Sequence, residues 1–268
     1  MAPDRYTHGH QESVLRSHRW RTAENSAAYL LPHLAPGQTL LDVGCGPATL
    51  TADLAALVAP GAVVAVDNAP AALDAARATL HDRSASNVTI EEADLYALPY
   101  PDGSFDVVHE HQVLQHLTDP VAALAELRRV CRPGGVVAAR EGDYPAMSWY
   151  PPDPGLDRWL AVYLAVARAN GAEPAAARHL LAWARRAGFA AVSPSASVWC
   201  FATTEDRRWW GELWADRSTG SAFAEQAVTG GHATDAELRG IAAAWRRWSE
   251  DPDGWYVSPH AEVLCRVA

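Results

Sequence analysis

Cysteine pairs and long apolar runs are missing from this sequence, and both absences narrow the class of protein. The four cysteines stand apart, without a Cys-x-x-Cys pair, so we expect them to be small buried hydrophobes in a reducing compartment. No apolar run approaches the length of a membrane span, and the N-terminal stretch MAPDRYTHGHQESVL contains no apolar signal core. We therefore expect a soluble, cytoplasmic protein.

Positive charge is also scarce. The 268 residues include 22 basic and 32 acidic ones, which gives a formal net charge of -10, and no long basic run occurs. Nucleic-acid binding requires basic side chains that neutralise phosphates, and anionic membrane surfaces attract basic segments. We therefore expect neither kind of partner. Hydrophobic residues make up 49% of the chain, which is enough for a sizeable buried core.

The stretch LLDVGCGPATL, residues 40–50, has the pattern of a strand, a tight turn and the start of a helix. Gly44 and Gly46 lack Cβ atoms, so the backbone can approach a ligand that the free N–H groups of the next helix would face. A dinucleotide fingerprint would need a third glycine where Thr49 stands, and a phosphate loop would need a lysine, which the chain lacks. Asp42, two residues before the first glycine, suits a cationic ligand better than a pyrophosphate. A turn that binds nothing is the alternative.

Acidic residues end the strands that follow. Asp67 ends VVAVD about 20 residues past the glycines, where an acid can accept the hydroxyls of a ribose; an N-cap for the next helix is the alternative. Asp94 ends the third expected strand, and Glu110 and His111 end the fourth. Because ligands bind beyond the carboxyl ends of parallel strands, we expect these side chains to converge.

Four motifs occur in a fixed order: DVGCGPATL, VVAVD, EEADLYALPYPDGSFDVVHEHQVLQHL and LRRVCRPGGVV. In this order and spacing the chain resembles the class I S-adenosylmethionine-dependent methyltransferases, most closely the ubiquinone/menaquinone C-methyltransferases and the small-molecule natural-product enzymes. The resemblance is close over residues 15–142 and loose elsewhere. The family usually has glycine where Ala48 stands, so we expect a slightly narrower turn without loss of binding.

The resemblance implies an α/β fold with a Rossmann-like, seven-stranded, doubly wound sheet, an antiparallel last strand and helical lid insertions. The alternation of apolar strands and helices independently implies a parallel sheet covered on both faces. We expect an N-terminal helical cap (1–35), a cofactor-binding core (36–142) and a remainder (143–268) with lid insertions at about 143–171 and 203–252. The expected strands are 39–45, 63–67, 88–93, 105–110, 134–140, 195–202 and 262–267, and the expected helices are 24–31, 49–58, 70–82, 119–131, 155–170, 174–187 and three within 203–252.

The resemblance also assigns a cofactor, S-adenosylmethionine, with S-adenosylhomocysteine as its product. Gly44 and Gly46 would let the backbone approach the methionine part and the ribose, and Asp67 would take the ribose hydroxyls. Arg21 could hold the methionine carboxylate, because a guanidinium matches a carboxylate bidentately; a surface arginine is the alternative. Asp42 would order the loop near the amino group, and Asp94 with the Leu95 backbone would read the adenine edge. The predicted cofactor-binding residues are Arg21, Asp42, Gly44, Gly46, Asp67, Asn68, Asp94, Leu95, Glu110 and His111.

Histidines cluster at the end of the fourth expected strand and just after it, at His109, His111 and His116. Zinc ligation is an alternative, but no fourth ligand stands at standard spacing, so we expect no metal; ordinary core or surface histidines are a second alternative. A neutral imidazole suits removal of a proton from a methyl acceptor, which typically raises a rate about 10²–10⁴-fold. His116 lies in LQHLTDP, where the sugar and natural-product O-methyltransferases that the chain resembles have a histidine. We therefore predict His116 as the base, with His111 as second candidate unless it only shapes the site.

Aromatic residues are concentrated late in the chain, where nine of 11 tryptophans fall between residues 149 and 248. They could line an apolar or aromatic acceptor pocket, or they could pack lid helices onto the core or form a dimer interface. The predicted substrate-binding residues are His8, Asp143, Tyr144, Trp149 and Trp214.

These observations predict a methyltransferase acting on a small apolar or aromatic molecule, as a monomer or homodimer, with oxygen favoured as acceptor atom. A menaquinone-type C-methyltransferase and a small-molecule N-methyltransferase are the enzyme alternatives. A protein that binds S-adenosylmethionine without transferring its methyl group is an alternative of another class. Thr49 disfavours an NAD-dependent oxidoreductase.

Overall fold

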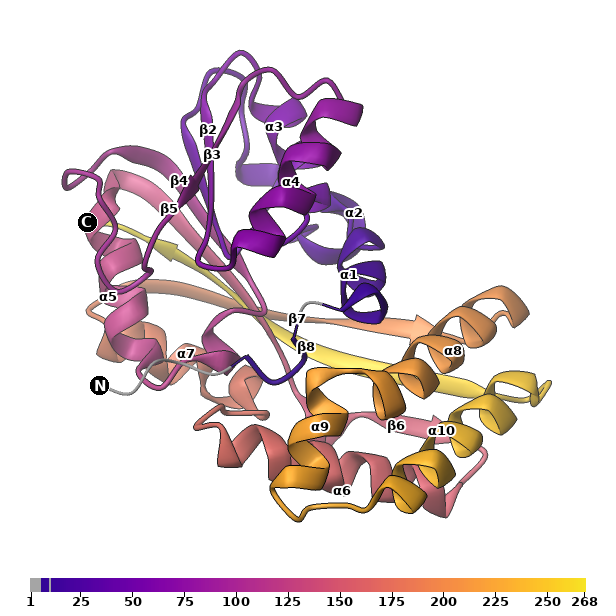
Figure 1. Cartoon of the computed structure of the whole chain (residues 1–268). Coiled ribbons are helices and arrows are strands. Elements are labelled where there is room, and N and C mark those ends of the chain that lie inside the picture. Colours follow the sequence, from indigo (N-terminus) through magenta and orange to yellow (C-terminus); the bar gives the residue numbers. More distant parts are fainter. Residues whose placement is uncertain (1–5, 10) are drawn as a thin grey trace.

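Eight strands form one sheet in the computed structural model, which describes residues 6–9 and 11–268 (Figure 1). The strand order is β3-β2-β1-β4-β5-β8-β6, and β7 pairs with β8. Strands β1 to β5 are parallel, whereas β8 runs antiparallel to β5, β6 and β7. The strands are β1 (Leu40–Val43), β2 (Val63–Asp67), β3 (Val88–Glu92), β4 (Phe105–His111), β5 (Cys131–Gly142), β6 (Ser148–Tyr150), β7 (Ala191–Phe201) and β8 (Trp255–Arg266).

The helices lie where the apolar periodicity predicts most of them. Those expected at 49–58 and 70–82 are confirmed to the residue, and three helices fill the second lid insertion as expected. The helices are α1 (Glu12–Arg19), α2 (Ala23–Ser26), α3 (Thr49–Val58), α4 (Pro70–Asp82), α5 (Pro120–Val130), α6 (Pro154–Ala169), α7 (Ala176–Arg186), α8 (Thr204–Gly220), α9 (Ala222–Thr229) and α10 (Asp235–Glu250). Short 3₁₀ turns are Leu31–His33, Leu114–His116 and Tyr144–Ala146.

Helices cover both faces of the central strands, which confirms the doubly wound α/β fold. Leu41, Val108 and Val137 pack in one cluster with α5 and α7, while Leu40 and Val107 pack in another with α3. Successive strand residues point to opposite faces, so each strand contributes to both clusters. Full burial of each such side chain stabilises the fold by about 1.5–3 kcal/mol.

Two expectations about the sheet are wrong. The sheet has eight strands instead of seven, because Ser148–Tyr150 pairs with the first residues of β8. Strand β8 also begins at Trp255 instead of residue 262. A three-residue strand shows no alternation that a sequence could reveal, and Pro259 within β8 reads as a strand breaker. Pro259 has no N–H to donate to a neighbouring strand. This is tolerated because β5 ends at Gly142, opposite His260, so Pro259 lies beyond the last residue pair of β5 and β8.

The N-terminal segment also differs from the expectation of a helix over residues 24–31. A capping box between Thr22 and Asn25 starts α2, which ends at Ser26 after one turn. The Ser26 hydroxyl donates to the Asn25 side chain, a local bond of the kind that competes with helix continuation. Helix α1, which the sequence reading did not identify, precedes it.

Four helices, α6, α8, α9 and α10, form what we call the helical lobe, at the end of the sheet where β6, β7 and β8 extend past the other strands (Figure 1). Its core includes four fully buried tryptophans: Trp159, Trp214, Trp245 and Trp248. The Trp159 ring lies edge-on to Trp214 and Trp245, at centroid distances of 4.5 and 4.9 Å, a favoured arrangement for aromatic pairs. Packing of the lobe, one of the alternatives, therefore accounts for most of the aromatic concentration.

Candidate active site

The turn after β1 uses the left-handed backbone region three times. Gly44 and Gly46 have φ values of 65° and 54°, and Ala48 has 58°. This region is free for glycine and costs other residues about 1–2 kcal/mol. A Cβ on Gly44 would overlap Cγ2 of Val113, so a larger residue does not fit there. Ala48 carries the strain at the N-cap of α3 with its methyl group buried.

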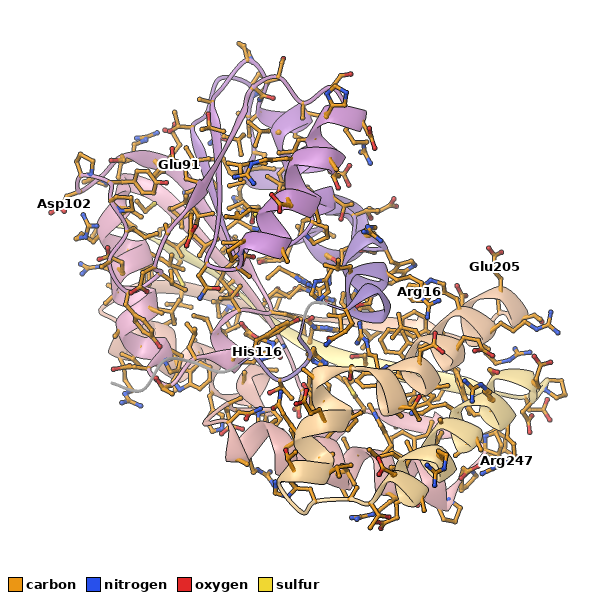
Figure 2. The ribbon with its side chains drawn as sticks, viewed as in Figure 1. Arg16, Glu91, Asp102, His116, Glu205 and Arg247 are labelled. Atoms are coloured by element: carbon orange, nitrogen blue, oxygen red, sulfur yellow. The ribbon has the colours of Figure 1, made fainter. Side chains whose placement is uncertain are left out.

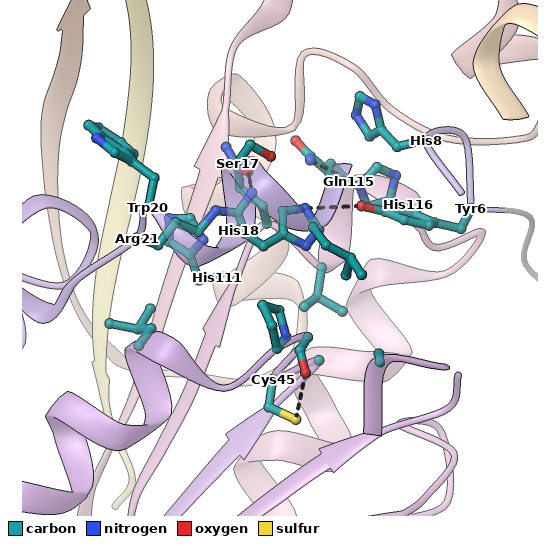
Figure 3. Close-up of a pocket in the computed structure, with 18 of the residues that line it drawn as sticks. Tyr6, His8, Ser17, His18, Trp20, Arg21, Cys45, His111, Gln115 and His116 are labelled. Carbon is teal, nitrogen blue, oxygen red and sulfur yellow. Dashed lines mark hydrogen bonds between the residues drawn. The ribbon is translucent and has the colours of Figure 1, made fainter. Parts of the chain in front are cut away.

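A cavity of about 200 Å³ lies beside this turn, between the carboxyl ends of the parallel strands, the N-terminal segment and the helical lobe (Figure 3). Figure 2 places His116 in the interior, between the two halves of the molecule, far from surface residues such as Asp102 and Arg247. The predicted site residues that line the cavity are His8, Arg21, Asp42, Gly44, Gly46, Asp67, Asn68, His111, His116, Tyr144 and Trp214.

The two acids near the turn are held firmly. The buried Asp42 accepts a hydrogen bond from Thr51 Oγ1 at 2.5 Å and contacts His109 Nδ1 at 2.7 Å. Asp67 accepts from the backbone N–H of Gly46 at 3.1 Å and of Ala69 at 3.0 Å. Because α4 begins at Pro70 with Ala69 as its N-cap, the N-cap alternative for Asp67 is wrong.

Other predicted residues lie outside the cavity lining. Asp94 is exposed and accepts from Tyr96 N at 2.9 Å, and Leu95 is buried in the core. Asp143 forms an ion pair with Arg178 at 2.6 Å. The partly buried Trp149 packs against the aromatic core of the helical lobe. The roles predicted for these residues stay predictions, and the geometry does not bring their side chains to the cavity.

Glu110 also lies outside the lining, in a buried carboxyl pair with Glu141 of the neighbouring strand. Glu110 accepts from Val113 N at 3.1 Å, and Glu141 accepts from Leu114 N at 2.7 Å. Burial, together with the Glu141 charge, raises the pKa of Glu110 well above its usual value, and burial raises the pKa of Glu141 to about 7. The pair therefore holds the backbone just before His116.

Imidazoles and tyrosines surround the end of the cavity near His116. His116 Nε2 lies 3.1 Å from Gln115 Nε2, and its buried Nδ1 contacts no polar partner among the described residues. Burial and the Arg21 charge lower the pKa of His116 to about 3. His8 Nε2 lies 3.2 Å from the Tyr144 hydroxyl, and burial lowers its pKa too. Both imidazoles are therefore neutral at neutral pH.

Several lining residues were missed by sequence reasoning. Gln112, at φ 58°, accepts a hydrogen bond from Arg21 at 2.5 Å. Its position right after His111, at a strand end, is the signal that could have identified it. The Arg217 guanidinium lies 5.0 Å from the Trp214 ring centre; the i, i+3 spacing of the two residues places them on one face of α8. Tyr6, whose hydroxyl lies 3.3 Å from His18 Nε2, comes from an N-terminal segment without a motif.

Within residues 6–9 and 11–268, no group of three or more His, Cys, Asp or Glu side chains is arranged to hold a metal ion. Over the same part of the chain, every helix is too short or too polar to cross a bilayer.

Known proteins are similar to this chain in sequence and in fold. A family model described as "Methyltransferase domain" matches residues 41–139. An uncharacterised methyltransferase of Schizosaccharomyces pombe is 37% identical, over 97% of this chain and 95% of its own length. The probable methyltransferase ltbC of Aspergillus luteorubrus is 30% identical, over 97% and 96%.

A solved structure has a similar fold. The YcgJ protein of Bacillus subtilis superposes with a TM-score of 0.59 at 17% identity, covering 91% of this chain and 99% of its own. That likeness concerns the fold alone, whereas the full-length relatives carry the family assignment. The family model and the full-length relatives are methyltransferases, and the glycine turn and the parallel sheet with its antiparallel last strand fit the same family. The chain belongs to the class I S-adenosylmethionine-dependent methyltransferases.

Proposed function

We propose that this methyltransferase methylates a hydroxyl oxygen of a small aromatic or apolar acceptor, with His116 as proton acceptor. The observation that carries the proposal is the buried His116 Nδ1, which has no polar partner among the described residues and lines the same cavity as the glycine turn. Buried polar atoms normally have partners, so an orphan in a cavity points to a ligand.

The residues at the turn fit the methionine and ribose parts of the cofactor. S-adenosylmethionine supplies an electrophilic methyl group on a sulfonium. Gly44 and Gly46 line the cavity without side chains of their own, and Asp67 stands at the end of β2 with its carboxylate held by Gly46 N. Arg21 lines the cavity with a buried Nε that lacks a partner in the described part of the chain. We assign it to the methionine carboxylate.

Acceptor recognition falls to the lid insertions. Tyr144 and Met147 come from the first insertion, and Trp210 and Trp214 come from the second; all four line the cavity. Flat rings and a thioether offer a surface suited to an aromatic or apolar molecule. His8 adds a polar group at this end, which can orient a hydroxyl.

Proton removal by His116 depends on the orientation of Gln115. An amide nitrogen only donates, so the observed contact leaves the His116 proton on Nδ1. Gln115 Oε1 is buried without a partner among the described residues. Rotating the amide by 180° pairs this oxygen with His116 Nε2–H and leaves a lone pair on Nδ1, the nitrogen that has no polar partner among the described residues. Amide orientation is assigned from such networks.

The low pKa of His116 limits the acceptors that it can serve. A weak base removes a proton best when the proton is already acidic. The O–H proton becomes acidic as the oxygen gains a bond to the methyl carbon, and a phenol or enol is acidic from the start. We therefore favour phenolic or enolic hydroxyls over alcohols.

The test is an assay of purified protein with S-adenosylmethionine and a panel of phenols, enols, quinols and sugars, followed by NMR of the methylated product. We expect O-methylation of a phenol or enol, with His116→Asn lowering kcat about 10²–10⁴-fold while S-adenosylhomocysteine affinity is retained. His179→Asn, an exposed substitution on α7, is the matched control. Methylation at carbon, or full activity of His116→Asn, would refute the proposal.

A further inference from the structure

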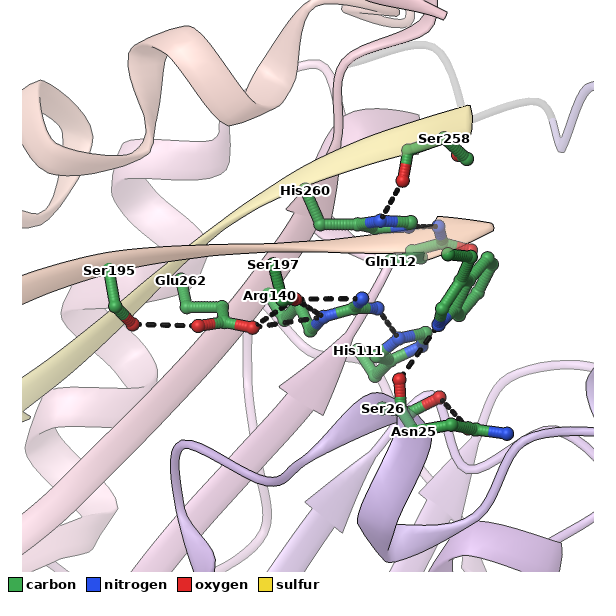
Figure 4. A network of polar contacts seen from close by, with 11 residues as sticks. Asn25, Ser26, His111, Gln112, Arg140, Ser195, Ser197, Ser258, His260 and Glu262 are labelled. Atoms are coloured by element: carbon green, nitrogen blue, oxygen red, sulfur yellow. Dashed lines mark hydrogen bonds and ion pairs between the residues drawn. The ribbon is translucent and has the colours of Figure 1, made fainter. Parts of the chain in front are cut away.

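Two buried arginines lie close to the cavity, and one of them lines it. Arg140, on β5, places its Nη1 2.7 Å from His111 Nε2 and its Nε 3.3 Å from Glu262 Oε1 (Figure 4). The Glu262 carboxylate therefore balances this charge inside the protein, away from the cavity lining. Arg217, on α8, is 4% exposed and is the one that lines the cavity. Its charge therefore lies at a surface that a ligand can contact.

The packing of α8 against α1 positions the Arg217 guanidinium. Its Nη2 donates to Val14 O at 3.2 Å and to Ser17 Oγ, both on α1. The guanidinium carbon lies 5.0 Å from the ring centre of Trp214, one turn earlier on α8, which adds a cation–π contact. Carbonyl and hydroxyl oxygens carry no net charge, so these contacts fix the direction of the guanidinium and leave its charge in place.

The positive charge of Arg217 acts on the imidazoles beside it. Burial, and next the Arg217 charge, lower the pKa of His8 well below its usual value. Burial and the charges of Arg21 and Arg217 likewise lower the pKa of His18. Burial lowers the pKa of Arg217 itself to about 10, so the guanidinium stays protonated at neutral pH. A field that disfavours a further positive charge favours a negative one, so this part of the cavity suits an anion.

The lobe end, as we call it, is the part of the cavity lined by His8, His116, Trp214 and Arg217. The His8 ring centre lies 5.9 Å from that of His116 and 6.0 Å from that of Trp214. Figure 3 shows both imidazoles away from Cys45 of the glycine turn. The buried Nε1–H of Trp214 has no partner among the described residues. The lobe end therefore offers an unused N–H donor on the ring that the Arg217 guanidinium contacts.

The carboxylates of the cavity lie at the glycine turn. Among the described lining residues the acids are Asp42 and Asp67. Asp42 accepts from Thr51 Oγ1, and Asp67 accepts from Gly46 N. These carboxylates suit the cationic cofactor, whose sulfonium carries the methyl group. The described lining thus has its negative charge at the turn and a positive charge at the lobe end.

We propose that Arg217 binds an anionic oxygen of the methyl acceptor. The acceptor is then an acid, with a carboxylate or an ionised hydroxyl in addition to the hydroxyl that is methylated. A guanidinium matches such a group in charge and in hydrogen-bond geometry, and a buried charge is costly unless an opposite charge meets it. The inference rests on the proposed function, which places the acceptor at the lobe end and assigns Arg21 to the cofactor, and it narrows the class of acceptor.

The first experiment uses the wild-type protein saturated with S-adenosylhomocysteine, and calorimetry measures the binding of matched probes. The pairs are para-hydroxybenzoic acid with its primary amide and para-hydroxycinnamic acid with its primary amide. At least one acid should bind about tenfold or more tightly than its amide, because the carboxylate pairs with the guanidinium and the amide does not. This result assigns the anion to a carboxylate.

A further probe, para-nitrophenol, tests the other source of an anionic oxygen. It has no carboxylate, and its ionised form absorbs visible light. Ionisation of the bound probe at a pH about one unit or more below that of the free probe assigns the anion to an ionised hydroxyl. The inference is overturned if neither acid is preferred over its amide and the nitrophenol either does not bind or ionises no more readily when bound.

The second experiment tests whether Arg217 causes the preference. Arg217→Met should reduce the acid-to-amide affinity ratio to about one and return the nitrophenol ionisation to that of the free probe. Arg217→Lys keeps the charge and should retain part of both effects. Arg208→Met, at an exposed ion pair with Glu250 on the same helix, is the matched control and should keep the wild-type values. If Arg217→Met weakens acid and amide by the same factor, Arg217 has only a structural role and the inference is refuted.

Neither experiment requires methyl transfer, so the two proposals can fail separately. Methylation at carbon, or full activity of His116→Asn, counts against the proposed function and leaves the acid-to-amide ratios unchanged. Confirmed O-methylation together with a ratio of about one in the wild-type protein, and with no shift of the nitrophenol ionisation, counts against this inference alone.

Discussion

The side chain of Val113 fills the space that a Cβ on Gly44 would need. The contact joins the turn after β1 to the segment after β4, and those strands are neighbours in the sheet. The shape of the glycine turn is therefore set partly by a residue almost 70 positions away in the chain. It follows that Gly44 and Val113 should be energetically coupled.

Gly44→Ala should abolish measurable S-adenosylhomocysteine binding in a calorimetric titration, because the methyl group overlaps Val113 in addition to the left-handed strain. Gly46→Ala is the matched control. Its φ of 54° carries similar strain, about 1–2 kcal/mol, but its Cβ would meet His18 Nδ1 at an ordinary 3.6 Å. Val113→Ala should partly restore binding to Gly44→Ala. Equal losses in the two alanine variants would contradict the steric argument.

Asp67→Asn should weaken S-adenosylhomocysteine binding about ten- to a hundredfold, because a neutral amide replaces the carboxylate that we assign to the ribose hydroxyls. The same change also weakens the bond from Gly46 N. Asp74→Asn, on the exposed face of α4 where Asp74 pairs with Arg77, is the control. Retention of full affinity by Asp67→Asn would remove the ribose role.

The Glu110–Glu141 pair should make stability fall as pH rises. Both folded-state pKa values are raised, so the folded state holds more protons, and this stabilisation is complete only below the unfolded pKa of about 4.5. It is lost as pH rises through the pKa of about 7 for Glu141. Glu110→Gln should match wild type in urea unfolding at pH 5 and exceed it at pH 8 by about 1 kcal/mol or more. Glu205→Gln, an exposed control, should show the same pH dependence of the unfolding free energy as the wild type. If all three proteins lose stability in parallel as the pH rises, the Glu110–Glu141 pair is not the cause of that loss.

Trp214→Phe should raise the KM for the acceptor about three- to tenfold by removing one hydrogen-bond donor, while S-adenosylhomocysteine affinity is kept. The buried Trp214 Nε1 has no partner among the described residues, and the ring lines the cavity. Trp159→Phe removes an indole from the same aromatic core outside the lining and should leave KM unchanged. Trp149→Phe should also leave it unchanged. A larger rise in KM for Trp149→Phe than for Trp214→Phe would instead support the predicted substrate role of Trp149.

The parts of the fold and site that the sequence could predict are those that depend on residues close together in the chain. Gly44, Gly46 and Asp67 lie at strand ends, where strand, turn and acid follow one another, and α3 and α4 show strong apolar periodicity. The structure brings these residues to one cavity, as expected for the carboxyl ends of parallel strands.

The remaining features depend on contacts between distant segments. Arg217 reaches the cavity only because α8 packs against α1, with its guanidinium donating to Val14 O at 3.2 Å. The roles of the two candidate bases depend on Arg140 and Gln115, whose positions relative to the imidazole nitrogens no motif encodes. Strand β6 is set by its pairing with β8 and not by its own three residues.

Strand β8 also decides how the molecule can be divided. Its second half pairs with β5, and its first half pairs with β6 beneath the helical lobe, with β7 alongside throughout. The border between the parallel part of the sheet and the helical lobe therefore runs along a hydrogen-bonded strand and not through a flexible linker. An exchange of helical lobes between relatives must transplant the β7–β8 ribbon together with the two insertions. A graft of the helices alone would leave Trp255 to His260 facing foreign partners.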